Sequence, residues 1–396
     1  MAKKILIVDD SALMRRVLSD IIDTDKRFVQ ADAANNGLEA YDLIVTNPSA
    51  YDLIILDINM PKMNGIQLME KMEEKNIHIP TLIVSTIAKE GAAETIRCLE
   101  LGAFDFITKP DSFLETKSDK FRDKIIRYLC EALKMPIEGF TPATTSTSSL
   151  SSGVEKLQKT STNAQTSATQ GTAGIKKPIN NDGPMSYVRV TDFKKKPHTN
   201  VSASANRLVA IACSTGGPKA LQQVIPQLPG NLAAPVLLVQ HMPEGFTGTL
   251  AARLDDMSAI KVTEANDGTV IEKGHVYIAK GGKHLRLRKK GRDYVIELGS
   301  DEPRNSLRPC ADIMYESLTS LDFDEITCVV LTGMGSDGTR GIGQLCSSKN
   351  CYVIAQDEAS STVYGMPRMI KEAGITDEVV TLNSIAKAIT NVVGTC

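Results

Sequence analysis

The sequence of 396 residues lacks the features that would place it in a membrane, outside the cell or on nucleic acid. No apolar run reaches the roughly 20 residues that span a bilayer. The first residues, MAKKILIVDD, contain no apolar stretch of signal-peptide length, and the eight cysteines show no C-x-x-C spacing. A net charge of -2 argues against a nucleic-acid-binding surface. We therefore expect a cytoplasmic protein with no membrane insertion and no nucleic-acid partner.

The chain is too long for one ordinary core, and its composition divides it into three parts. Residues 1–136 and 206–396 each alternate short β-rich apolar runs with longer helical segments. Residues 137–205 are rich in Ser, Thr, Ala, Gln and Gly, which predicts a flexible linker. The predicted fold class is α/β in both domains. The first is a doubly wound (βα)5 domain, and the second is doubly wound and mostly parallel, with a local antiparallel hairpin between Lys261 and Leu298.

Carboxylates end two of the predicted strands in the first domain. Asp9 and Asp10 end ILIVDD, and Asp57 ends LIILD. Because the carboxyl ends of parallel strands gather at one edge of a sheet, these groups can converge on one crevice. Carboxylates that repel one another suit a hard cation such as Mg²⁺. Asp10 and Asp57 would bind it through their side chains, and Asn59 would bind it through its backbone carbonyl.

The next two strands add a hydroxyl and a cation to this edge. Ser85 lies in TLIVST and Lys109 in FITKP. A phosphoryl group on Asp57 would then meet Mg²⁺, an ammonium and a hydroxyl donor, which is the set that phosphoryl transfer requires. A solvated aspartate that starts a turn explains any one of these residues, but it does not explain the ordered set.

This ordered set resembles the receiver domain of bacterial response regulators along the whole first domain. The resemblance implies that Asp57 accepts the phosphoryl group and that Ser85 and Lys109 respond to it. It also implies that Phe106 is the switching aromatic residue and that a histidine kinase is the phosphodonor.

Three residues with the chemistry of a hydrolase follow strands of the second domain. Ser214 follows LVAIAC, His241 follows PVLLVQ, and Asp337 lies in VVLTGMGSDGTRG. Nucleophilic hydrolysis needs a hydroxyl, a base and a carboxylate that orients the base. His241 is the favoured base, since the other four histidines lie in the first domain, the linker or the hairpin region. We expect the Met334 N–H to bind the oxyanion, together with the amide next to Ser214 or the side chain of Thr215.

Each of these residues also has a structural explanation. His241 alone could be a satisfied structural histidine, and Asp337 could cap a helix that begins at Gly338. A rival function is an anion-binding module, in which STGGP is a nest of backbone N–H groups and Ser214 caps the next helix. The chain lacks the G-x-x-x-x-G-K-[ST] and G-x-G-x-x-G spacings of nucleotide sites. A third alternative is a regulator that acts by protein contact alone.

Four segments resemble the catalytic domain of chemotaxis protein-glutamate methylesterases: IACSTGGPKALQQVIPQLP, VQHMPEGFTGTLAARLD, GMGSDGTRGI and AQDEASSTVYGMP. By position, Ser214 matches the nucleophile of that family, His241 its base and Asp337 its orienting acid. Two positions depart from the family pattern. Ala212 replaces a usual glycine, and Cys310 lies in RPCAD, where Pro-Ser-Val-Asp is usual.

The resemblance implies hydrolysis of glutamate γ-methyl esters on the cytoplasmic helices of methyl-accepting chemoreceptors, with release of methanol. It implies deamidation of receptor glutamines at the same site, and no cofactor for either reaction. It also implies that the unphosphorylated receiver packs over the esterase face, and that phosphorylation of Asp57 weakens this packing and opens the site.

Overall fold

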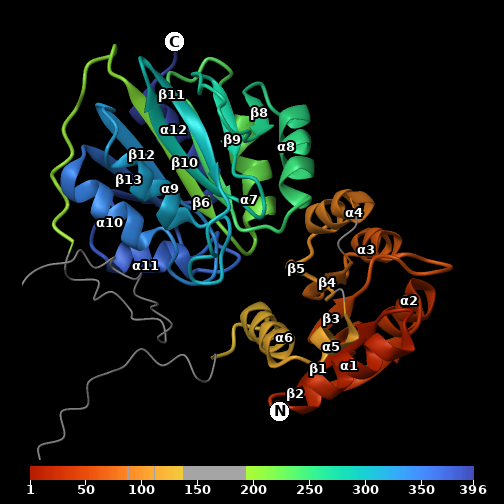
Figure 1. Ribbon diagram of the computed structural model, residues 1–396. Helices are drawn as coiled ribbons and strands as arrows, with labels where there is room; N and C mark the ends of the chain where they lie inside the picture. The colour runs from red at the N-terminus through yellow and green to blue at the C-terminus, as the bar shows by residue number, and fades with distance from the viewer. Residues whose placement is uncertain (87–88, 111, 137–192) are drawn as a thin grey trace, which may run out of the picture. The chain divides into compact units, whose positions relative to one another are not determined.

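The computed structural model describes residues 1–86, 89–110, 112–136 and 193–396 (Figure 1). Most of the predicted linker, residues 137–192, lies outside the described residues. Within those described ranges, no helix has both the length and the apolar character that a membrane crossing requires.

The N-terminal domain is a five-stranded sheet in the order β2-β1-β3-β4-β5, with every neighbouring pair parallel. Its strands and helices, in chain order, are β1 (Lys3–Val8), α1 (Ala12–Asp23), β2 (Phe28–Ala34), α2 (Gly37–Thr46), β3 (Leu53–Leu56), α3 (Gly65–Glu74), β4 (Thr81–Ser85), α4 (Lys89–Glu100), β5 (Asp105–Thr108), α5 (Phe113–Thr116) and α6 (Asp119–Ala132).

Both faces of this sheet are buried, which explains the uninterrupted apolar runs of its inner strands. Successive residues of a strand point to opposite faces. Ile5 and Ile7 of β1 therefore belong to the core that includes α1 and α6, whereas Leu6 and Val8 belong to the core that includes α2 and α3. The strand β2 lies at an edge and is largely exposed, so its sequence, FVQADAA, lacks such a run.

The C-terminal domain contains a seven-stranded sheet in the order β14-β13-β12-β6-β7-β9-β8 and a two-stranded hairpin, β10-β11. Its strands and helices are β6 (Arg207–Cys213), α7 (Gly217–Val224), β7 (Val236–Gln240), α8 (Phe246–Met257), β8 (Lys261–Glu264), β9 (His275–Ile278), β10 (His284–Lys290), β11 (Asp293–Gly299), α9 (Ala311–Leu318), β12 (Glu325–Val330), α10 (Thr339–Ser348), β13 (Cys351–Gln356), α11 (Met366–Glu372), β14 (Glu378–Val380) and α12 (Ile385–Val393).

Helices cover both faces of this sheet as well (Figure 1). Val209 and Ile211 of β6 belong to the core that includes α7, α8 and α12. Leu208 and Ala210 belong to the core that includes α9, α10 and α11. The predicted doubly wound architecture is therefore confirmed in both domains.

The predicted hairpin is confirmed only in part. The strands β10 and β11 are antiparallel, and the KKGR segment forms the turn between them. The two shorter strands before them, β8 and β9, instead join the large sheet in parallel pairs, β8 with β9 and β9 with β7. Their apolar runs are short because they lie at and near the edge of the sheet, and short runs do not reveal strand direction.

Residues 193–205 contact the C-terminal domain, so the linker prediction is wrong for this segment. The Lys196 N–H donates to Cys346 O at 2.9 Å, and His198 Nε2 lies 2.6 Å from Glu325 Oε1. The Thr199 N–H donates to Asn350 Oδ1 at 3.0 Å. These partners lie more than a hundred residues away in the sequence, so local composition does not reveal them.

Candidate active site and acidic pocket

Ser214 and His241 lie next to each other because β6 and β7 end at the same level. Cys213, the last residue of β6, pairs with Gln240, the last residue of β7. The His241 N–H donates to Cys213 O at 3.1 Å, and Gln240 Nε2 donates to Ser214 O at 2.9 Å. The residue after each strand is therefore held at the carboxyl edge of the sheet, as the sequence predicts.

The turn after Ser214 requires glycine at two positions. Gly216 has a φ of +75°, and a Cβ there would lie 2.4 Å from Thr362 Cβ. A Cβ at Gly217 would lie 1.9 Å from Gln240 Oε1. Gly216, which has no side chain, is also the N-cap of α7, and among the described residues no amide of this helix donates to the Ser214 hydroxyl. Ser214 therefore does not have the capping role that the anion-binding alternative assigns to it.

His241 is oriented by a buried carboxylate. His241 Nε2 lies 2.7 Å from Asp337 Oδ2, which leaves Nδ1 as the ring nitrogen not engaged by Asp337. Within the described residues, the Ser214 hydroxyl makes no hydrogen bond to His241. Catalytic hydrogen bonds are often long before substrate binds, so this geometry agrees with a free hydrolase.

Asp337 accepts further hydrogen bonds from the start of two helices. Its Oδ2 accepts the Ala311 N–H at 2.6 Å, and its Oδ1 accepts the Asp312 N–H at 2.9 Å. Oδ1 also accepts the Gly338 N–H at 3.0 Å and the Cys310 thiol at 3.1 Å. Ala311 and Asp312 open α9, so unpaired amides and the positive end of the helix dipole both stabilise the carboxylate.

Asp312 is a second buried carboxylate beside Asp337. Its Oδ1 accepts the Gly338 N–H at 3.0 Å and the Gly341 N–H at 2.7 Å, so a residue of α9 caps α10. Because Asp312 caps α10, the role of Asp337 is not explained by helix capping alone. No spacing rule in the sequence points to Asp312 or Cys310. The departure at RPCAD was the one local signal.

The two carboxylates have opposite pKa shifts. Burial raises the pKa of Asp312 to about 7, and the charge of Asp337 adds to this rise. Burial alone would also raise the pKa of Asp337. The hydrogen bond and charge of His241, together with the amides of Asp312 and Ala311, outweigh burial and lower the pKa to about 2. Asp337 therefore stays ionised beside His241, while its neighbour carries a proton more readily.

The candidate oxyanion donors lie in the two loops that meet at Ser214. A Cβ on Gly333 would lie 2.8 Å from Ser214 Cβ, so the loop that contains Met334 passes directly beside the serine. Thr215 is held through its carbonyl, which accepts from Thr332 Oγ1 at 2.9 Å. The Ser214 N–H itself donates to Thr332 O. The N–H groups of Met334 and Thr215 donate to no acceptor in the described part of the chain, so both are free to bind an anion.

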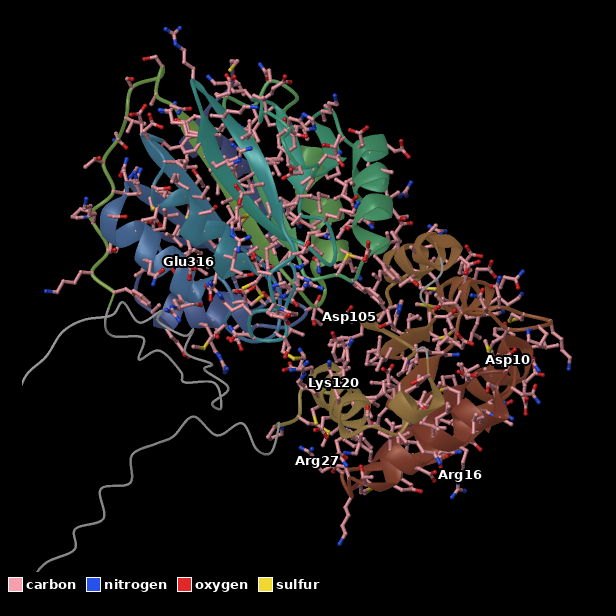
Figure 2. The ribbon with its side chains drawn as sticks, viewed as in Figure 1. Asp10, Arg16, Arg27, Asp105, Lys120 and Glu316 are labelled. Carbon is pink, nitrogen blue, oxygen red and sulfur yellow. The ribbon has the colours of Figure 1, made fainter. Side chains whose placement is uncertain are left out.

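The first domain brings its predicted charged residues together at the carboxyl edge of the sheet. Lys109 Nζ lies 2.7 Å from Asp9 Oδ2 and 2.8 Å from Asp57 Oδ2. The carboxylates of Asp9, Asp10 and Asp57 all lie within 4.8 Å of one another, and Figure 2 labels Asp10. Three carboxylates at this spacing are a donor set that fits a hard divalent cation. Asn59 is exposed in the loop that follows β3.

The acidic pocket also changes the protonation of its central residue. Burial raises the pKa of Asp57 to about 6, although the Lys109 charge and hydrogen bond oppose the rise. Ser85, at the end of β4, is 2% exposed, and its hydroxyl has no hydrogen-bond partner among the described residues. The Lys109 N–H donates to Ser85 O at 2.7 Å, which places the two residues at the same level. Phe106 lies in β5, the neighbouring strand.

Comparisons with known proteins match both domains. The CheB methylesterase family matches residues 209–389, and the response regulator receiver domain matches residues 5–117. The protein-glutamate methylesterase/protein-glutamine glutaminase of Halalkalibacterium halodurans is 37% identical over 386 residues, covering 98% of this chain and 97% of its own. The protein of the same name from Bacillus subtilis is 36% identical over 391 residues, covering 98% of each chain.

Two solved structures are also similar to parts of the chain. The Thermotoga maritima CheB methylesterase catalytic domain is 38% identical and covers 47% of this chain and 98% of its own, with a TM-score of 0.46. The response regulator domain of Thermotoga maritima CheB is 35% identical and covers 35% of this chain and all of its own, with a TM-score of 0.30.

Proposed function

Because this chain belongs to the CheB methylesterase family and carries a receiver domain before the esterase, we propose that Ser214, His241 and Asp337 hydrolyse glutamate γ-methyl esters of chemoreceptors. The same site deamidates receptor glutamines, in line with the double name of its relatives. The observation that carries this assignment is the 2.7 Å contact between His241 and Asp337 beside Ser214. We assign residues 1–136 to the receiver and residues 193–396 to the esterase, and we place the enzyme in the cytoplasm.

The geometry supports acyl transfer through a serine ester. Ser214 Oγ attacks the ester or amide carbonyl, and His241 Nδ1 takes the serine proton. The N–H groups of Met334 and Thr215 bind the oxyanion that forms. His241 then gives its proton to the leaving group, which departs as methanol or ammonia, and water hydrolyses the glutamyl ester on Ser214. Asp337 holds the imidazole in the required tautomer and stabilises its charged form, so the esterase needs no cofactor.

The test is release of methanol from membranes that contain methylated receptor, and of ammonia from receptor with glutamines at the same sites. Ser214→Ala should lower both rates at least a thousandfold, since the nucleophile is lost. Ser347→Ala is a matched control, because in the described part of the chain this exposed serine of α10 bonds only to a carbonyl of its own helix. Release by Ser214→Ala at the wild-type rate, or no labelling of Ser214 by a serine-directed phosphonate, would contradict the assignment.

For the receiver domain, we propose that Asp57 accepts a phosphoryl group from a chemotaxis histidine kinase. Asp10 and Asp57 would hold Mg²⁺ through their side chains, and Asn59 would hold it through its carbonyl. The cation supplies positive charge against the phosphoryl oxygens. Lys109 already pairs with Asp57, and the hydroxyl of Ser85, which has no partner among the described residues, is available to the phosphoryl group.

Phosphorylation should then raise the rate of hydrolysis. Ser85 ends β4, Phe106 lies in β5, and Lys109 directly follows β5. We therefore expect a change at Asp57 to affect these two strands first. Asp57→Asn should leave basal methanol release unchanged and abolish its stimulation by a phosphodonor. Asp52→Asn is the control, because this carboxylate pairs with Lys3 just before β3, away from the pocket. Stimulation that survives in Asp57→Asn would disprove the switch while leaving the esterase assignment intact.

A further inference from the structure

The esterase domain contains three thiols that the hydrolysis does not use. Cys328 lies in β12, Cys346 in the last turn of α10, and Cys351 is the first residue of β13. All three are 0% exposed, and their Sγ atoms lie within 4.8 Å of one another. Cys351 begins its strand at the amino edge of the sheet, whereas the catalytic residues follow strands at the carboxyl edge. The thiol cluster is therefore separate from the active site.

Cysteine binds a metal ion as the thiolate, so binding at this cluster displaces the thiol protons. The Lys195 ammonium, which pairs with Asp377, adds positive charge near Cys351.

Strand register argues against a disulfide between Cys328 and Cys351. Cys328 lies opposite Val353, so Cys351 is two residues earlier on the neighbouring strand. Strands lie about 4.8 Å apart and two residues advance about 6.6 Å, so the two Cα atoms are about 8 Å apart. That separation exceeds the roughly 7 Å that a disulfide can bridge without backbone movement. Cys346 comes from the helix layer above the sheet. Cys328 and Cys351 thus direct their thiols to one point from backbones that are too far apart for a disulfide between them.

We propose that Cys328, Cys346 and Cys351 form a three-thiolate site for a soft cation, with Cu(I) as the preferred ion. Thiolates select soft ions such as Cu(I) over hard ones. Closed Zn²⁺ sites take four protein ligands, and within the described residues no fourth His, Cys, Asp or Glu joins this group. The cluster also belongs to the apolar core that includes Ile326 and Leu345.

An ion can reach the cluster from the nearby surface. Cys346 is followed by Ser347 and Ser348, which are exposed, and the short turn after them leads directly to Cys351. Opening of this turn would uncover two of the three thiols without disturbing the centre of the sheet. Loading can also occur during folding, because ligands that are separate in the unfolded chain assemble with the sheet.

The first experiment is an anaerobic titration of the reduced full-length protein with Cu(I) against a chromogenic Cu(I) chelator. All proteins carry Cys396→Ser, which removes the cysteine that is exposed among the described ones. Cys351→Ala and Cys346→Ala should bind Cu(I) at least tenfold more weakly than this background, because each loses one of three ligands. Cys98→Ala is the matched control, since it removes a buried thiol of the other domain.

Two measurements keep the test decisive if a variant does not fold. The parent protein should melt at a higher temperature with one equivalent of Cu(I), because an ion that binds only the folded state stabilises it. X-ray absorption of that complex should show three sulfur ligands. Binding that is as tight in Cys351→Ala as in the parent, an unchanged melting temperature, or fewer than three sulfur ligands would overturn the proposal.

Discussion

Asp337 and Asp312 are neighbouring buried carboxylates, but replacement by Asn should be harmful at Asp337 and mild at Asp312. In Asp337→Asn, the amide nitrogen cannot accept hydrogen bonds, yet both carboxylate oxygens of Asp337 accept them in the wild type. With the amide nitrogen in the Oδ2 position, the Ala311 N–H loses its acceptor. His241 Nε2 must then accept a hydrogen bond from that nitrogen instead of donating one. His241 Nδ1 is then protonated and cannot take the proton of Ser214.

The magnitude follows from these contacts. An unpaired buried amide at Ala311 costs about 1 to 3 kcal/mol. The three bonds to the other oxygen each weaken by about 1 kcal/mol when the acceptor loses its charge. Asp337→Asn should therefore lower the free energy of unfolding by roughly 4 kcal/mol or more, and the wrong tautomer should lower kcat by about 10⁴-fold. In Asp312→Asn, one oxygen keeps both the Gly338 and Gly341 bonds, so at about pH 4, where Asp312 of the folded wild type is also neutral, the free energy of unfolding should change by less than about 1 kcal/mol.

The assay is methanol release for kcat and urea unfolding for stability, on both variants and the wild type. Asp322→Asn, a change in an exposed carboxylate that pairs with Lys289, measures the effect of charge loss at the surface. The reasoning is refuted if Asp337→Asn keeps more than about a tenth of the wild-type kcat, or if Asp312→Asn is as inactive as Asp337→Asn.

Three further predictions concern Asp312, Asp57 and the turn after Ser214. The pKa of Asp312 in the folded state is raised to about 7, so the free energy of unfolding should fall as pH rises from about 4 through 7. Urea unfolding across this pH range measures the fall, and Asp312→Asn should remove it. At low Mg²⁺, the rate of Asp57 phosphorylation by an acyl phosphate should fall about tenfold per pH unit below about pH 6. Saturating Mg²⁺ should move the inflection of this pH–rate curve to lower pH. An inflection that does not move argues against a cation at Asp57. Gly217→Ala should lower the free energy of unfolding by about 2 to 4 kcal/mol, because the new Cβ displaces Gln240. Gly248→Ala is the control and should not lower it, because a Cβ at that position makes only ordinary van der Waals contacts.

The parallel strands were the most predictable part of the fold. Strands such as β1, β3 and β6 are buried on both faces, so each appears as a continuous apolar run that ends where a polar residue begins. The same rule located the acidic pocket and the three residues that we propose are catalytic, because each of these side chains lies at or shortly after the end of such a run. It did not locate the exposed edge strand β2, nor did it give the direction of β8 and β9.

Contacts between distant segments were not predictable in the same way. Composition alone assigned residues 193–205 to the linker, yet His198 is held by Glu325, which lies in β12. The thiols of Cys328, Cys346 and Cys351 have no recognisable spacing, because a strand, a helix and a second strand carry them to one point.

The sequence by itself determined which residues lie at the strand ends, and hence the hydroxyl, base and carboxylates available for chemistry. Hydrophobic burial imposes this order locally, since each apolar run must be covered and its polar end must reach the edge of the sheet. Only the tertiary structure decided the protonation and orientation of those groups. Asp337 is kept ionised by His241 and by amides that open α9, and Asp312 is pushed toward its neutral form by burial beside it. Hydrogen bonding and electrostatic energy depend on distances between segments that fold together from far apart, and a linear pattern does not contain those distances.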